Sequence, residues 1–202
     1  MLTKWFLLGM LALAPAVVVG AGDAEAGKAL AAPCGACHGQ NGVAIVPGAP
    51  NLAGQSARYL KSQLEMIKSG VRPVPLMAGQ LDPMSSGDLD NLATYFASMS
   101  ATVGQADGDL ISVGEQIYRG GISQKAVPAC TACHTPTGSG NVLAGFPHIG
   151  GQRADYVIVQ LVAYREGTRQ TDDAYGAAMR QVANGLTDRE ISALASYIQG
   201  LY

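Results

Sequence analysis

Apolar residues along this chain recur at helical rather than strand spacing. The clearest stretch covers 56–69, and a matching stretch covers 153–166. In the first, the apolar side chains share one helical face: Tyr59, Leu60, Leu64 and Ile67. Alternating apolar and polar positions of useful strand length are absent from the sequence. The pattern therefore predicts an all-α protein.

Further helices are expected before and after these two. Residues 24–31 and 110–119 are predicted as helices that each lead into a cysteine cluster. The last helix of each half is expected to begin at Ser85 and at Thr187. Glu190 follows Thr187 by three residues, which is a capping-box pattern. The apolar face of this last helix is then continuous: Ile191, Leu194, Ala195 and Ile198.

The N-terminal segment has a different character from the rest of the chain. Lys4 precedes the apolar run 5–19, and three small residues follow. This order is typical of a secretory signal peptide, so we assign 1–21 to a leader that directs export and is cleaved after Gly20 or Ala21. The alternative is a retained membrane anchor, for which the run is short, since a spanning helix needs ~20 apolar residues.

The remaining chain is an internal duplication. Cys34-Gly-Ala-Cys37-His38 returns 96 residues later as Cys130-Thr-Ala-Cys133-His134. The segment 50–55 is echoed by 147–152. Further matched pairs follow at constant spacing within each helix: Tyr59 with Tyr156, Gln63 with Gln160, Leu92 with Leu194, and Tyr95 with Tyr197.

A segment of small and polar residues, 101–109, separates the two copies. We therefore predict an N-terminal domain over 22–100, a linker over 101–109 and a C-terminal domain over 110–202.

Loss of Lys4 with the leader changes the net charge from −2 to −3. No clustered basic face is present, which argues against nucleic-acid binding. Domains this small often depend on a cofactor for stability.

Each cysteine cluster is typical of a haem-attachment site. Two thiols at this spacing can each add to one vinyl group of a haem, and the next histidine can ligate the iron. The sequence thus predicts two covalently bound haem c groups: one on Cys34 and Cys37 with His38, the other on Cys130 and Cys133 with His134. The long Gly/Pro-rich loops 39–55 and 135–151 are expected to wrap the cofactors.

Three other interpretations of the cysteines were weighed. A redox dithiol would need a thioredoxin-like βαβ pattern, which the sequence lacks. A structural zinc site would need a closed set of four ligands. A plain disulfide is the simplest possibility in an exported protein. Haem attachment is favoured because both pairs are followed by histidine and all four cysteines are used.

The sixth iron ligand is expected to be methionine, which is usual for low-spin haems of this type. The second half contains only Met179, and alignment of the last helices pairs it with Met77. We assign these two as ligands. The other first-half methionines after the leader are expected to fill the core: Met66, Met84 and Met99. His148 stands opposite Asn51 in the duplication and is expected to be a loop residue.

These features resemble the class I cytochromes c, and in particular the dihaem cytochrome c4 family. The resemblance covers essentially the whole mature chain. It rests on the tandem haem motifs, the Pro-x-Leu/Ile-x-Gly-Gln after each, the Tyr-x-x-x-Gln-Leu of each middle helix, the paired methionines and the Tyr-Ile-Gln-Gly-Leu of 197–201. It implies that the carbonyls of Pro50 and Pro147 accept hydrogen bonds from Nδ1 of His38 and His134.

The resemblance also implies that Gly27 and Gly114 lie where first and last helices cross, facing Tyr95 and Tyr197. The chain departs from the simplest pattern in its second half. Sixteen residues separate Gly114 from Cys130, against seven between Gly27 and Cys34, and the loop before Met179 is longer than that before Met77. We expect these differences to affect the exposure and potentials of the two haems.

The resemblance implies a periplasmic electron carrier between a quinol-oxidising complex and a terminal oxidase or reductase, with haems packed across a domain interface. Closed His/Met coordination leaves no substrate site on iron, so the protein is not expected to be an enzyme. Its partners are then redox proteins, with no small-molecule substrate, and loose membrane association is left open. The alternatives are a haem c subunit of a dehydrogenase complex and a dihaem peroxidase, which would need an open iron.

Overall fold

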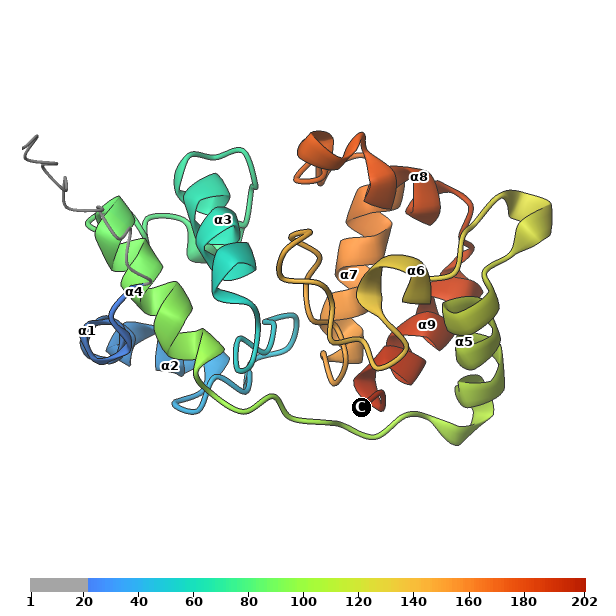
Figure 1. Cartoon of the computed structure of the whole chain (residues 1–202), viewed down its shortest axis with the longest axis horizontal. Helices are drawn as coiled ribbons and strands as arrows, with labels where there is room; N and C mark the ends of the chain where they lie inside the picture. The colour runs from blue at the N-terminus through green and yellow to red at the C-terminus, as the bar shows by residue number, and fades with distance from the viewer. Residues whose placement is uncertain (1–21) are drawn as a thin grey trace, which may run out of the picture.

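A computed structural model describes residues 22–202 as two helical halves joined by an extended segment (Figure 1). The expected signal peptide, 1–21, lies outside the described residues. The first half contains α1 (Ala24–Leu30), α2 (Gly35–His38), α3 (Ala57–Lys68) and α4 (Ser86–Ala97), with 3₁₀ turns at Ala32–Cys34 and Pro75–Met77. The second contains α5 (Gly108–Gly120), α6 (Thr131–His134), α7 (Ala154–Arg165), α8 (Ala178–Asn184) and α9 (Asp188–Gln199), with 3₁₀ turns at Ser123–Lys125 and Asp173–Tyr175. Over these residues the only strand-like pairings are isolated bridges, so the all-α prediction is confirmed.

Both last helices begin with a complete capping box. At α9 the Thr187 hydroxyl accepts from the Glu190 amide and the Glu190 carboxylate accepts from the Thr187 amide, as the sequence predicts. At α4 the same two bonds are made by Ser85 and Asp88. Each box satisfies amide groups that the first helical turn would otherwise leave without partners.

Helix α8, which contains Met179, was not predicted. Its N-cap residue, Ala177, has a left-handed backbone (φ 60°) and no side chain that could cap the helix. The usual sequence signal for a helix start is therefore missing. The added turn lengthens the second half at the position where its sequence departs from the first.

In each half the last helix packs against both the first and the middle helix. Helix α4 contacts α1 and α3, and α9 contacts α5 and α7. A Cβ added to Gly27 would overlap the carbonyl oxygen of Asn91, and one added to Gly114 would overlap that of Ala193. Both glycines therefore permit a close helix crossing, and the expected approach to the helices that carry Tyr95 and Tyr197 is confirmed.

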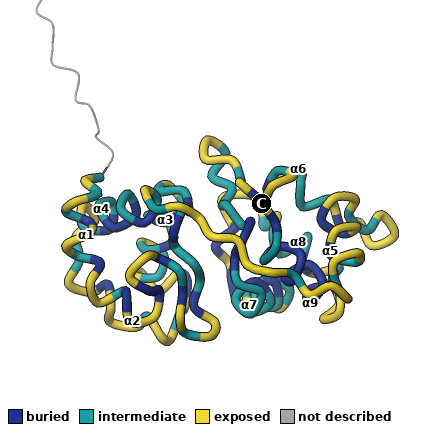
Figure 2. The backbone as a smooth tube through the Cα atoms, turned by 90° about the horizontal axis from the view of Figure 1, so that it is seen from below, coloured by how far each residue is buried: buried dark blue, intermediate teal, exposed yellow. Residues whose placement is uncertain are grey.

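Helices α3 and α7 lie on the facing sides of the two halves (Figure 1). The connecting segment, 100–107, runs along the second half and binds the end of α9. The Gly104 amide donates to the Gln199 carbonyl at 2.9 Å, and the Asp107 amide donates to Oγ of Ser196 at 2.8 Å. Figure 2 shows buried backbone within each half and an exposed connecting segment.

Among residues 22–202, no helix has both the length and the apolar character needed to span a bilayer.

We predict that Gly114→Ala lowers the free energy of unfolding by about 1–3 kcal/mol, because the added methyl group meets α9 backbone. Gly120→Ala in the same helix is the matched control. Nothing lies within 4 Å of its added Cβ, so stability should stay the same or rise by up to about 1 kcal/mol. Denaturant unfolding followed by circular dichroism measures both. Equal stability of the two variants would contradict a tight crossing.

Candidate functional site

The two cysteine motifs are each folded into a single helical turn. Cys34 is the N-cap of α2, and Cys37 and His38 lie within it. Helix α6 repeats the arrangement with its own motif: Cys130, Cys133 and His134. In both motifs the first thiol is half-buried, the second is exposed, and neither forms a disulfide. Residues three apart on a helix share a face, so each motif presents two free thiols to one side.

The motif histidines are buried and oriented by a backbone carbonyl. His38 and His134 are each 8% exposed. Nδ1 of His38 lies 2.9 Å from the Pro50 oxygen, and Nδ1 of His134 lies 3.0 Å from the Pro147 oxygen. A carbonyl can only accept, so Nδ1 carries the proton and Nε2 keeps its lone pair. Burial lowers the pKa of both histidines, although the proline carbonyl acts the other way. A neutral imidazole held in this way suits a metal ligand.

The methionines fall into different environments. Met77 ends the 3₁₀ turn Pro75–Met77 and is half-buried, and Met179 is half-buried beside the second core. Met84 and Met99 pack against the first core, as expected for filler residues. Their counterparts are buried in the second core: Leu186 and Leu201. Met66 instead accepts a weak hydrogen bond from a glutamine amide at 3.9 Å.

A second cluster, between the two halves, was not predicted from the sequence. Arg72 and Arg169 stand 97 residues apart, at equivalent positions of the duplication. Each guanidinium donates across the interface to a tyrosine hydroxyl at 2.9 Å and a glutamine oxygen at 3.1 Å: Tyr156 and Gln160 for Arg72, Tyr59 and Gln63 for Arg169. The contacts are reciprocal, as in a two-fold symmetric dimer interface.

This interface cluster holds two buried cations. Arg72 is 8% exposed and Arg169 is 6% exposed. None of the ion pairs formed among residues 22–202 includes either of them, and residues 1–21 contain no Asp or Glu. Burial alone would raise the pKa of Tyr156, but the neighbouring guanidinium groups lower it overall. Buried cations without an anion are costly, so this cluster fits a carboxylate-bearing cofactor such as haem.

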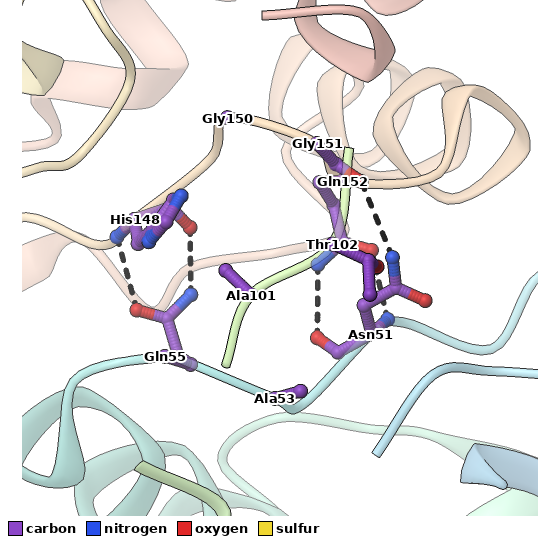
Figure 3. Close-up of a pocket in the computed structure, with 9 residues that line it drawn as sticks. All are labelled: Asn51, Ala53, Gln55, Ala101, Thr102, His148, Gly150, Gly151 and Gln152. Atoms are coloured by element: carbon purple, nitrogen blue, oxygen red, sulfur yellow. Dashed lines mark hydrogen bonds between the residues drawn. The ribbon is translucent and has the colours of Figure 1, made fainter. Parts of the chain in front are cut away.

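Two buried glutamines complete the contact between the halves (Figure 3). Gln152 Oε1 accepts from the Asn51 amide at 2.8 Å, and Nε2 donates to the Asn51 carbonyl at 3.0 Å. Gln55 makes the same pair of bonds to the His148 backbone, at 3.0 Å and 2.7 Å. Each half therefore binds one peptide segment of the other with matching atoms. His148 lies in the loop, as predicted, and is bound through its backbone.

The duplication in the sequence itself carries a signal for the two arginines. The same offset of 97 residues that relates Tyr59 to Tyr156 also relates Arg72 to Arg169. Each arginine follows a glycine with positive φ just after the middle helix, Gly70 (φ 79°) or Gly167 (φ 70°). Matching every polar residue along the duplication would have identified the pair.

Comparisons with known proteins agree on one family. The cytochrome c family model matches residues 24–100 and 114–202. Cytochrome c4 of Pseudomonas aeruginosa is 50% identical over 195 residues, which cover 96% of this chain and 94% of that protein. The crystal structure of reduced recombinant cytochrome c4 from Pseudomonas stutzeri has a TM-score of 0.87 and 49% identity, covering 90% of this chain and 100% of that one. A thiosulfate dehydrogenase electron acceptor of Stutzerimonas stutzeri is 32% identical, over 96% of this chain and 93% of that protein.

We predict that Arg169→Lys loosens the contact between the halves, because one ammonium group cannot replace a planar donor with several partners. Limited proteolysis of segment 100–107 should become about tenfold faster, the equivalent of ~1.4 kcal/mol. Arg119→Lys is the control, since Arg119 pairs with Glu115 on the exposed face of α5. Unchanged cleavage of the Arg169 variant would contradict a role for this residue in docking.

Proposed function

Because the chain belongs to the cytochrome c family, and within it to the dihaem cytochromes c4, we propose that it carries electrons in the periplasm from a quinol-oxidising complex to a terminal oxidase or reductase. The observation that carries this proposal is the pair of complete motifs, each with two free thiols and a buried histidine oriented by a proline carbonyl. The leader pattern at 1–21 supports export.

In this proposal each domain holds one haem. Domain 22–100 binds the first and domain 110–202 the second, with 101–109 as linker. Haem attachment and ligation use matched residues in the two domains: Cys34, Cys37, His38 and Met77 in the first, Cys130, Cys133, His134 and Met179 in the second. Pro50 and Pro147 fix the histidine rings. Bound haem supplies a reversible one-electron couple.

The chain's own residues define the rest of the mechanism. Nε2 of each motif histidine and the sulfur of Met77 or Met179 would hold the iron of each haem, and with those ligands in place water and small substrates would be kept from it. The guanidinium groups of Arg72 and Arg169, buried at the interface without a protein carboxylate, would neutralise the carboxylates of bound haem there.

A second candidate is an electron acceptor for a dehydrogenase. It is favoured by the similarity to the thiosulfate dehydrogenase electron acceptor of Stutzerimonas stutzeri. This candidate uses the same haem sites and differs only in the donor. A peroxidase is less well supported, because each half offers a methionine at the equivalent position to close its iron.

The function is tested with the purified mature holoprotein and membranes that contain a quinol-oxidising complex and a terminal oxidase. Catalytic amounts of the protein should stimulate quinol-dependent oxygen uptake, and both haems should cycle between oxidation states. Reduction by a thiosulfate dehydrogenase but not by the quinol-oxidising complex would favour the second candidate. Stoichiometric carbon monoxide binding to one reduced haem would overturn the closed-carrier proposal.

The methionine assignment gives a separate prediction. Met77→His and Met179→His should each lower the potential of one haem, because imidazole stabilises ferric iron better than a thioether does. Each variant should also lose the weak near-infrared band of Met–Fe(III) at that haem. Met84→Leu is the control, since Met84 packs against the first core, and its spectrum should match the wild type. Unaltered bands in both histidine variants would show that other residues are the ligands.

A further inference from the structure

The peptide group between Pro50 and Asn51 makes a hydrogen bond at each end. Its carbonyl oxygen accepts from Nδ1 of His38 at 2.9 Å. Its N–H donates to Oε1 of Gln152, in the other domain, at 2.8 Å. One planar amide therefore connects a residue of the second domain to the histidine of the first.

The second domain has the same arrangement in reverse. The peptide group between Pro147 and His148 accepts from Nδ1 of His134 at 3.0 Å and donates to Oε1 of Gln55 at 3.0 Å. Figure 3 shows both glutamines reaching across to the opposite loop. The two chains of hydrogen bonds use identical atom types at equivalent positions of the duplication.

The orientation of each glutamine amide is fixed by its other bonds. Nε2 of Gln152 donates to the Asn51 carbonyl at 3.0 Å, and Nε2 of Gln55 donates to the His148 carbonyl at 2.7 Å. Oε1 also accepts from the next amide along its own chain, that of Arg153 or Ser56. If the side-chain amide were flipped, its NH₂ group would face the peptide N–H and its oxygen would face the peptide carbonyl. Oε1 must therefore face the peptide N–H.

An amide whose N–H is hydrogen-bonded becomes a better acceptor at its oxygen, because chains of hydrogen bonds polarise one another. A stronger acceptor at Nδ1–H makes the imidazole a more basic ligand. A more basic ligand stabilises ferric iron and lowers the reduction potential. The effect reaches the histidine of the domain that does not contain the glutamine.

We propose that Gln152 tunes the haem of the first domain and Gln55 that of the second, so that docking of the two domains lowers both reduction potentials. This proposal rests on the assignment of His38 and His134 as iron ligands. The glutamines act as positioning residues, since they touch a peptide group and not the haem ligand itself. The contact made by Arg58 does not reach a motif histidine in this way. Its Nη1 donates to the Leu143 carbonyl at 2.6 Å, and that carbonyl is bonded to neither His38 nor His134.

The test is a redox titration of Gln152→Met holoprotein, with each haem followed by its own paramagnetically shifted methyl signals in NMR. Methionine keeps the length of the side chain but removes the amide. The ferrous-to-ferric ratio of the first haem at a fixed potential should rise by roughly two- to tenfold, while the second haem stays unchanged. Gln55→Met should give the mirror result. The ¹⁵N shift of Nδ1 should move only in His38 or only in His134, respectively.

Arg58→Met is the matched control, because it removes a contact between the domains that reaches no histidine peptide; neither potential should move. If Gln152→Met folds poorly, Gln152→Asn keeps the amide but is one methylene too short, and should raise the same potential. Equal shifts of both haems, or none, in variants with intact Met–Fe bands would overturn the tuning and leave the carrier function standing. Absence of His/Met bands in the wild type would instead refute the ligand assignment.

Discussion

Two buried guanidinium groups determine how the halves of this molecule can meet. Arg72 and Arg169 each reach across the contact to a tyrosine and a glutamine, and no carboxylate of the described chain pairs with either. Neutral donors and acceptors orient such cations but do not cancel their charge. In the proposed holoprotein the haem carboxylates would supply the missing negative charge, and cofactor loading and docking of the halves would then be interdependent.

Because the contact is polar, its geometry is specified by hydrogen bonds rather than by an apolar seam. The arginine pair and the glutamine pair follow the same two-fold relation, so each bond in one direction has an equivalent in the other. Gene duplication supplies this symmetry at the outset, because both copies begin with the same residues at the contact. The covalent linker then keeps the two copies at high effective concentration.

The sequence predicted most of the helices, because amphipathic periodicity and the Thr187–Glu190 capping box are local signals. The cysteine and histidine motifs were equally predictable from the sequence, since their chemistry depends on spacing within one helical turn. Helix α8 could not be predicted, because its N-cap residue, Ala177, has no side chain that could cap it. The interface was missed for another reason: Arg72 and Gln152 find hydrogen-bond partners in the opposite half, and no local pattern in the sequence indicates such partners.

The histidine contacts are the same in the two halves, whereas the segments around the methionines differ. Asp172 is 3% exposed and accepts from the amide of Arg180 at 2.9 Å and from its Nε at 2.8 Å, next to Met179. Ala78, which follows Met77, has only a methyl side chain and cannot form an ion pair of this kind. The segment carrying Met179 is therefore held by a buried carboxylate, and that carrying Met77 by a short 3₁₀ turn. Two copies of one fold thus share their means of docking and differ in the contacts that hold their methionine segments.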